Sequence, residues 1–295
     1  MFRACLGSGA ALGIVTSLTL QMEDESSFKT GGSLVFACAN KVTAKPFLEK
    51  ALQFLTNVVL PLPSVSMEIV ITSDYTVICT FMFYDRFIGD PEEFVQQLRD
   101  DGKACNVQCV ADSVTSHSSW YNSASSLWTV IGGMKGDPLV RLDHCIGTSE
   151  SPSAEVLDFV IEKWVGEFLT LAPLSLVEIR TLGGDGIESD NLPSGNTKCL
   201  FFADMIVSYD GSTVESEDKS SISKEVHDII SEAKKIPSLN VDFSGTHCQP
   251  DDSVDTLPAG NVIFGSKENY EFVKDVKKRN DPEKRFCFHP FTHLM

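Results

Sequence analysis

The chain has 295 residues, 42% of them hydrophobic, and a formal net charge of −17 at pH 7. This hydrophobic fraction is enough to form a real core, which argues against wholesale disorder. The acidic excess argues against a nucleic-acid partner, because phosphate backbones are bound by clustered lysine and arginine. The basic run at 274–279 is interrupted by Asp275 and is expected to be a solvated helix face. No window has the length and apolarity of a membrane span.

Hydrophobic spacing and turn residues predict the following elements in chain order: a strand over 33–38, a helix over 46–59, a hairpin of strands 65–71 and 76–83, a helix starting at 90, a short strand over 107–111, a helix over 151–169, strands over 175–182 and 200–209, and a helix over 220–235. Asp90 followed by Pro91 is a strong start signal, because Asp caps helices and Pro suits their first turn. Strands in antiparallel order with helices between them predict an α+β fold: an antiparallel multi-stranded sheet covered by helices. Most of the segment 86–150 gives no clear pattern and is expected to shape any substrate pocket.

The last thirty residues predict an amphipathic helix with an abrupt end. Tyr270, Val273 and Val276 share one helical face, and the lysines and acids are expected on the other. Pro282 has no backbone donor and disfavours helical geometry in the preceding residue. The helix is therefore predicted to end near Asn280.

Three segments resemble a known family. An Asn-aromatic helix with spaced lysines that runs into Asp-Pro-x-x-x-Phe, at 269–286, is similar to the closing segment of the berberine-bridge-enzyme-like FAD-linked oxidases. Residues 175–209 resemble the strand, Gly-Gly turn and strand of that family. Residues 1–21 resemble the last glycine-rich turn and strand of its FAD-binding domain. The resemblance implies a remnant of the FAD-binding domain at 1–22 and a substrate-binding domain at 33–295, whose C-terminal helix and tail occupy 264–295.

The family carries out the oxidation of an alcohol, sugar or alkaloid-type small molecule. Hydride goes to FAD, a carboxylate or phenol takes the proton, and O₂ is the re-oxidant. The resemblance places Asp204 at the polar, substrate-facing position of its strand, where it would be the base. The residues alone also single out Asp204, because a carboxylate between Phe202 and Ile206 costs desolvation energy unless it is paired. Burial raises a carboxyl pKa, which suits a general base. The alternatives are that Asp204 points into solvent or pairs with a structural lysine or arginine.

The same resemblance places Gly13, Ile14 and Val15 along the FAD, together with Asn269 at the start of the final helix. From the residues alone, an ordinary apolar strand after a glycine turn explains Gly13 to Val15 equally well. The chain departs from the family at 262–265, where Val-Ile-Phe-Gly stands in place of a tyrosine-bearing segment, and in the tail, where Pro or Phe replaces a glutamine. The alternative function is therefore a truncated, non-catalytic remnant or binding protein that has lost flavin binding. Activity would require a longer native chain or a separate flavin domain as partner.

Other residues favour structural interpretations. The nine cysteines are scattered and their odd number leaves at least one unpaired, which favours buried thiols in a reducing, cytoplasmic setting. The apolar N-terminus could pass for a signal peptide, but three glycines interrupt it, so secretion is less favoured. The six histidines form no metal-binding pattern. Trp120, Tyr121 and Trp128 recur at helical spacing, which usually indicates core.

Overall fold

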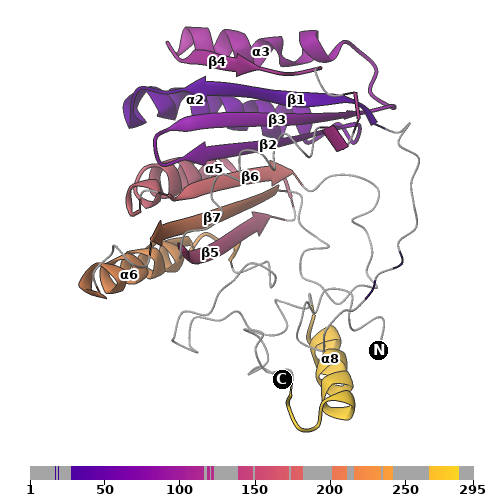
Figure 1. Ribbon diagram of the computed structural model, residues 1–295, viewed down its shortest axis with the longest axis vertical. Coiled ribbons are helices and arrows are strands. Elements are labelled where there is room, and N and C mark those ends of the chain that lie inside the picture. The colour runs from indigo at the N-terminus through magenta and orange to yellow at the C-terminus, as the bar shows by residue number, and fades with distance from the viewer. Residues whose placement is uncertain are drawn as a thin grey trace.

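The computed structural model contains one eight-stranded sheet with helices packed against it (Figure 1). It describes residues 17, 19, 28–115, 118–119, 121–122, 139–148, 150–172, 174–181, 201–210, 216–233, 235–241 and 266–285. The strand order is β4-β1-β3-β2-β6-β7-β5-β8, and every neighbouring pair is antiparallel. The α+β prediction of an antiparallel sheet covered by helices is confirmed.

The strands are β1 (Phe28–Ala37), β2 (Val65–Thr72), β3 (Thr76–Tyr84), β4 (Gln108–Asp112), β5 (Leu139–Thr148), β6 (Leu176–Thr181), β7 (Phe201–Asp210) and β8 (Asn240–Val241). The α-helices are α2 (Lys41–Phe54), α3 (Pro91–Ala104), α5 (Ala154–Phe159), α6 (Ser216–Ala233) and α8 (Lys267–Asn280). Shorter π-helical and 3₁₀ segments follow α2 and α5, namely η3 (Leu55–Val59), η4 (Val160–Val165) and η5 (Phe168–Thr170).

One face of the sheet forms the hydrophobic core. Alternate residues of the central strands are buried there, among them Ile69 of β2, Phe81 of β3 and Ile179 of β6. Aromatic rings from the helices complete this core. The ring centroid of Phe54 in α2 lies 6.5 Å from that of Phe81, and the two rings meet edge to face. Because side chains alternate along a strand, the other residues of each strand project from the second face. We call that second face the distal face, and Figure 1 shows the strands in front of α2 and α5, so it is turned toward the viewer.

The helix starts follow their capping residues. Asp90 caps α3 by accepting a hydrogen bond from the Glu92 backbone at 2.8 Å, with Pro91 in the first turn, as predicted. The predicted start of α2 was wrong. Asn40 and Thr43 form a reciprocal capping box that begins the helix at Lys41, five residues before the predicted start. The predicted helix over 151–169 is likewise divided into α5, η4 and η5.

The α8 helix ends at Asn280, as predicted from Pro282. Val273 and Val276 are buried as expected, but one lysine departs from the predicted solvated face. The Lys277 ammonium lies 2.8 Å from an Asp281 carboxylate oxygen, and both side chains are about 5% exposed or less. A buried ion pair therefore holds the C-terminal turn of this helix.

Two further features differ from the sequence analysis. Strand β5, which pairs along ten residues with β7, was not predicted, since it lies in the segment that gave no clear pattern. Tyr121 is 75% exposed, which contradicts a core role. Trp120 and Trp128 lie outside the described residues.

Candidate functional site

Asp204 lies at the middle of β7 and is almost completely buried, with 1% of its surface exposed. Its neighbours Ala203 and Met205 belong to the core, so Asp204 projects from the distal face. Its register partners are Glu178 on β6 and Cys145 on β5. The alternative in which Asp204 points into solvent is therefore wrong.

Three further charged residues share this face, and sequence reasoning had not selected them. Glu178 is paired directly with Asp204, and Arg180 on the same strand is paired with Glu68 of β2. Directly paired residues have Cβ atoms about 4.5–5.5 Å apart, so these side chains form one group across three strands. We call Glu68, Glu178, Arg180 and Asp204 the carboxyl cluster.

Arg180 joins two members of the carboxyl cluster. Its Nη1 lies 2.5 Å from an oxygen of Glu178 and 3.8 Å from an oxygen of Glu68. The Glu178 and Glu68 side chains are 19% and 20% exposed. Glu178 and Glu68 thus share the guanidinium of Arg180 in a partly desolvated place.

Glu68 responds to this environment most strongly. The pKa of its carboxyl is raised to about 8, mainly by burial and also by the hydrogen bond with the Glu178 carboxyl and the charge of Glu178, against the lowering effect of Arg180. At neutral pH, Glu68 therefore keeps its proton and shares a hydrogen bond with the Glu178 carboxyl. The site holds a carboxylic acid and a carboxylate side by side, the arrangement that proton-transfer chemistry uses.

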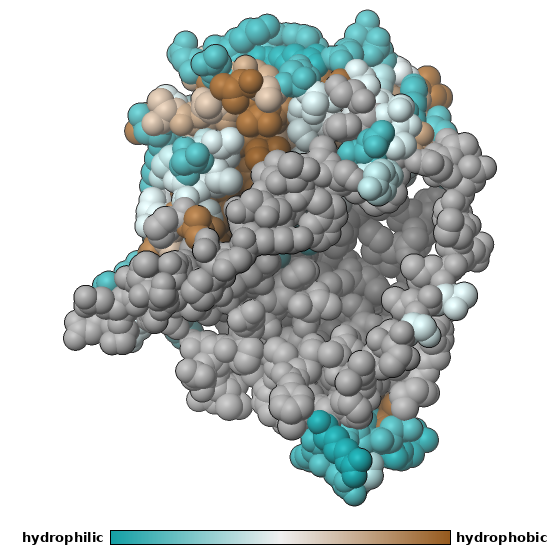
Figure 2. Space-filling view, viewed as in Figure 1, coloured by the Kyte–Doolittle hydropathy of each residue, from teal (hydrophilic) through white to brown (hydrophobic). Residues whose placement is uncertain are grey.

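An apolar row continues the carboxyl cluster toward β1. Val35, Ile78 and Val70 are register partners on β1, β3 and β2, all partly exposed, and Val70 is in turn paired with Glu178. Figure 2 shows a hydrophobic band over these strands on the same face. The distal face therefore carries an apolar row whose last residue, Val70, is paired with a residue of the carboxyl cluster.

The residues of the distal face fit some parts of FAD and not others. The apolar row and the cluster beside it suit an uncharged aromatic ring or a ligand that bears hydroxyl groups. The pyrophosphate of FAD does not fit the carboxyl cluster, because Glu178 and Asp204 would repel it and Arg180 is held between carboxyls. The phosphates would need a site elsewhere in the protein.

The remaining residues assigned to FAD are Gly13, Ile14, Val15 and Asn269. Gly13, Ile14 and Val15 lie outside the described residues. Asn269 is half-buried in the first turn of α8, where its backbone N–H donates to the cap Ser266 Oγ at 3.1 Å. Figure 1 shows α8 apart from β7. A role for Asn269 in flavin binding stays a prediction.

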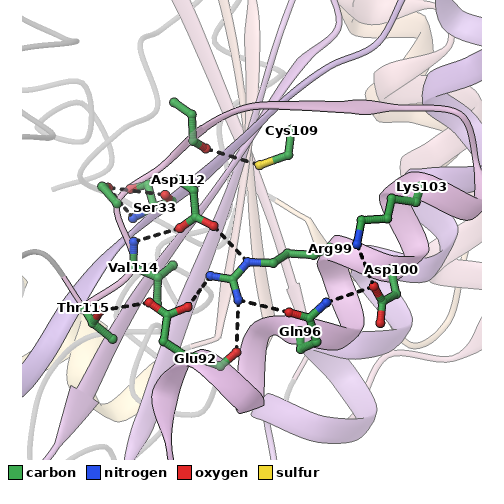
Figure 3. Close-up of polar contacts among 12 residues, drawn as sticks. Ser33, Glu92, Gln96, Arg99, Asp100, Lys103, Cys109, Asp112, Val114 and Thr115 are labelled. Atoms are coloured by element: carbon green, nitrogen blue, oxygen red, sulfur yellow. Dashed lines mark hydrogen bonds and ion pairs between the residues drawn. The ribbon is translucent and has the colours of Figure 1, made fainter.

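A second arginine, Arg99, lies between two carboxylates at the edge of the sheet (Figure 3). Arg99 of α3 lies 2.5 Å from Glu92 and 2.9 Å from Asp112 of β4. The side chains of Glu92 and Asp112 are 45% and 39% exposed, about twice as much as those of Glu68 and Glu178. This network links the edge strand β4 to α3.

Within the described ranges, no group of His, Cys, Asp and Glu is arranged to hold a metal ion, and no helix could span a bilayer. In the same ranges the thiols of Cys38 and Cys79 are free and buried, as expected. Cys109 is also free but exposed, which departs from the expectation of buried thiols.

No protein-family model and no curated protein sequence matches the chain. Solved structures do. CrmK, a flavoenzyme involved in shunt product recycling in caerulomycin biosynthesis, is 15% identical with a TM-score of 0.67, over 91% of this chain and 56% of that one. A carbohydrate oxidase from Microdochium nivale is 15% identical with a TM-score of 0.60, over 97% and 60%. BBE-like #28 from Arabidopsis thaliana is 15% identical with a TM-score of 0.54, over 87% and 56%.

The chain thus spans between half and three fifths of the length of each of these proteins. At this level of identity, the likeness concerns the fold. The solved structures with this fold include oxidases of oligosaccharides and flavoenzymes of natural-product biosynthesis. The chain therefore has the fold of the berberine-bridge-enzyme-like FAD-linked oxidoreductases, the family that its sequence resembles.

Proposed function

We propose that this chain provides the substrate-binding part of an FAD-dependent oxidoreductase that oxidises a hydroxyl-bearing small molecule, an alcohol, a sugar or an alkaloid-type compound. The observation that carries the proposal is the buried Asp204 on the distal face of a sheet whose fold is that of flavoenzymes. Buried ionisable side chains of this kind are candidates for functional sites.

The chain's own residues would bind the substrate and accept its proton. Asp204 would take the proton of the substrate hydroxyl, as a buried carboxyl group beside Glu178 on the neighbouring strand. The apolar row at Val35, Ile78 and Val70 would contact the less polar surface of the substrate. Bound FAD would supply the hydride acceptor, with O₂ as the re-oxidant.

The structural neighbours suggest which substrates to try first. They include a chitooligosaccharide oxidase and a xylooligosaccharide oxidase in complex with xylobiose. Sugars fit the distal face chemically, since carboxyl groups accept hydrogen bonds from hydroxyls and C–H faces pack on apolar side chains. An oligosaccharide is therefore the first substrate class to test.

The experiment is an FAD titration of the purified full chain, followed by visible absorbance and flavin fluorescence. The proposal predicts a saturable change, and the Asp204→Asn variant should show the same change because the carboxylate does not hold the cofactor. Calorimetry with chitooligosaccharide and with xylobiose follows on the same samples. A chain that binds an oligosaccharide but gives no flavin signal would contradict the oxidoreductase and support a binding protein without redox activity.

A further inference from the structure

A hollow that is separate from the carboxyl cluster lies where β2 begins and β3 ends. It is bounded by the turn that leads into β2 and by the loop that joins β3 to α3, and its volume is about 510 Å³. Small-molecule sites have volumes of about 300–1,000 Å³. We call this place the loop hollow. Its lining includes no residue of the carboxyl cluster and none of the apolar row, so it is a second candidate place for a ligand.

Apolar side chains from both walls line the loop hollow. The rings of Phe87, in the loop, and Phe94, in α3, meet edge to face with their centroids 5.3 Å apart. Leu62 lines the hollow from the turn before β2. Ile88 also lines it and is 98% exposed. A ligand in the hollow would cover this isoleucine and remove its apolar surface from water, which favours binding.

The two walls of the loop hollow are held together by contacts within the protein. The Tyr84 backbone N–H donates to the Ser64 carbonyl oxygen at 2.9 Å and so joins the end of β3 to the turn before β2. The Lys29 ammonium donates to the carbonyl oxygens on both sides of Ile88, at 3.4 and 3.2 Å. Because these contacts exist before a ligand arrives, little conformational freedom is lost on binding.

Charged side chains of both signs also line the loop hollow. They are Arg86, Asp90 and Glu93, and all three are exposed. Asp90 is fixed in place, because it caps α3 through the Glu92 backbone N–H. A ligand with a net charge would meet a like charge among these residues. A hydroxyl group suits both signs, since it donates to a carboxylate and accepts from a guanidinium.

We propose that the loop hollow binds an uncharged aromatic small molecule that bears a hydroxyl group. Its ring would pack against Phe87, Phe94 and Ile88, and its hydroxyl would reach the carboxylate of Glu93. The proposal does not rest on the proposed function, because the hollow shares no residue with the carboxyl cluster. A second copy of the chain is the competing occupant, since an exposed Ile88 also suits a protein contact.

Methyl NMR of the full chain, labelled at isoleucine, tests the proposal without flavin or sugar. Naphthol is the probe, and methoxynaphthalene is its matched analogue without an O–H. The Ile88 signal is the one lost in Ile88→Val. We expect naphthol to shift this signal in a saturable way, and the analogue to bind about tenfold more weakly because it cannot donate to a carboxylate. Xylobiose should not displace naphthol.

Two exposed aliphatic residues give a matched pair of variants. Ile88→Asp should lower the affinity for naphthol, measured by equilibrium dialysis, by about tenfold or more, because it removes apolar contact area. Val42→Asp is the control. Val42 is 79% exposed on α2 and does not line the loop hollow, so this variant should bind naphthol as wild type does. Neither substitution removes a buried side chain, so both variants should fold.

Three results would overturn the proposal. The first is an Ile88 signal that does not shift in a saturable way with naphthol. The second is an equal loss of affinity in Ile88→Asp and Val42→Asp, which would place the binding elsewhere. The third comes from sedimentation: a wild-type dimer that becomes a monomer in Ile88→Asp would assign the loop hollow to a second copy of the chain.

Discussion

Glu178 and Asp204 are direct register partners on β6 and β7, and both project from the distal face of the sheet. Like charges directly opposite each other destabilise a sheet, so two acidic residues at paired positions are unusual. Arg180 offsets part of the cost through its contact with Glu178. An arrangement that costs stability and lies at the middle of a sheet is typical of a functional site.

Glu68 makes the stability of the chain depend on pH. The pKa of its carboxyl is raised from 4.5 to about 8 in the folded protein, mainly by burial. Between these values the folded state keeps a proton that the unfolded state releases, so a rise in pH favours unfolding. We expect the free energy of unfolding, measured with urea, to have this contribution in full below about pH 4.5, to lose it progressively as the pH rises, and to level off above about pH 8.

The Glu68→Gln variant should remove most of this slope, because glutamine cannot release a proton. Glu92→Gln is the control, since Glu92 also contacts an arginine but is 45% exposed. It should leave the slope in place. Equal slopes in wild type and Glu68→Gln would show that Glu68 is ionised at neutral pH, contrary to the geometry described above.

Gly32 lies where β1 and β4 come closest. A Cβ atom at this position would overlap the backbone carbonyl of Ser113, and the backbone φ of +157° is itself unfavourable for other residues. Gly32→Ala should therefore cost about 1–3 kcal/mol or more and loosen the edge strand. Urea unfolding measures the loss, and hydrogen exchange should locate it in β4. Ser113→Ala removes only hydrogen bonds to Ser33 and should cost less, about 1 kcal/mol. Equal costs for the two variants would contradict the clash.

The buried pair of Lys277 and Asp281 should contribute strongly to the order of α8. Lys277→Met leaves the Asp281 carboxylate buried without its ammonium partner at 2.8 Å, which typically costs about 3–5 kcal/mol. Arg279→Met is the matched control. Arg279 also pairs with an acid four residues away, Asp275, but both side chains are more than 60% exposed, and such pairs contribute about 0.3–0.5 kcal/mol. Hydrogen exchange of the α8 amides distinguishes the two, and equal protection in both variants would argue against the buried pair.

The described thiols should react at very different rates. Burial raises the pKa of Cys38 to about 11 and raises that of Cys79 further, so few thiolates form there near neutral pH. Cys109 is exposed on the edge strand β4. Alkylation followed by mass spectrometry should modify Cys109 first, and the two buried thiols only after unfolding. Early modification of Cys79 would contradict the described packing of β3.

The fold followed from sequence wherever a local signal agreed with its tertiary setting. The hairpin of β2 and β3 and the start of α3 at Pro91 were predicted correctly, because turn and capping residues act locally. Strand β5 was missed, since it is fixed by long-range pairing with β7. The start of α2 was misplaced because the helix was predicted from hydrophobic periodicity, and the Asn40 capping box upstream was overlooked.

The candidate site was predicted only in part. Asp204 stood out as a carboxylate in an apolar strand, and its burial agrees with that reasoning. Glu68, Glu178 and Arg180 were missed, because each alternates with apolar residues and so looks like an ordinary solvent-facing position. The signal was present as Glu-x-Arg in β6, but only the register of β2, β6 and β7 brings the four side chains together.

Asp204 is proposed to be the proton acceptor of a flavin-linked oxidation. The direct measurement is the rate at which an oligosaccharide bleaches the flavin absorbance of the FAD-loaded chain without oxygen, in wild type and in Asp204→Asn. We expect bleaching in wild type and a rate about 10²- to 10⁴-fold lower in the variant, the usual contribution of a general base. Equal rates in the two proteins would contradict the assignment of Asp204.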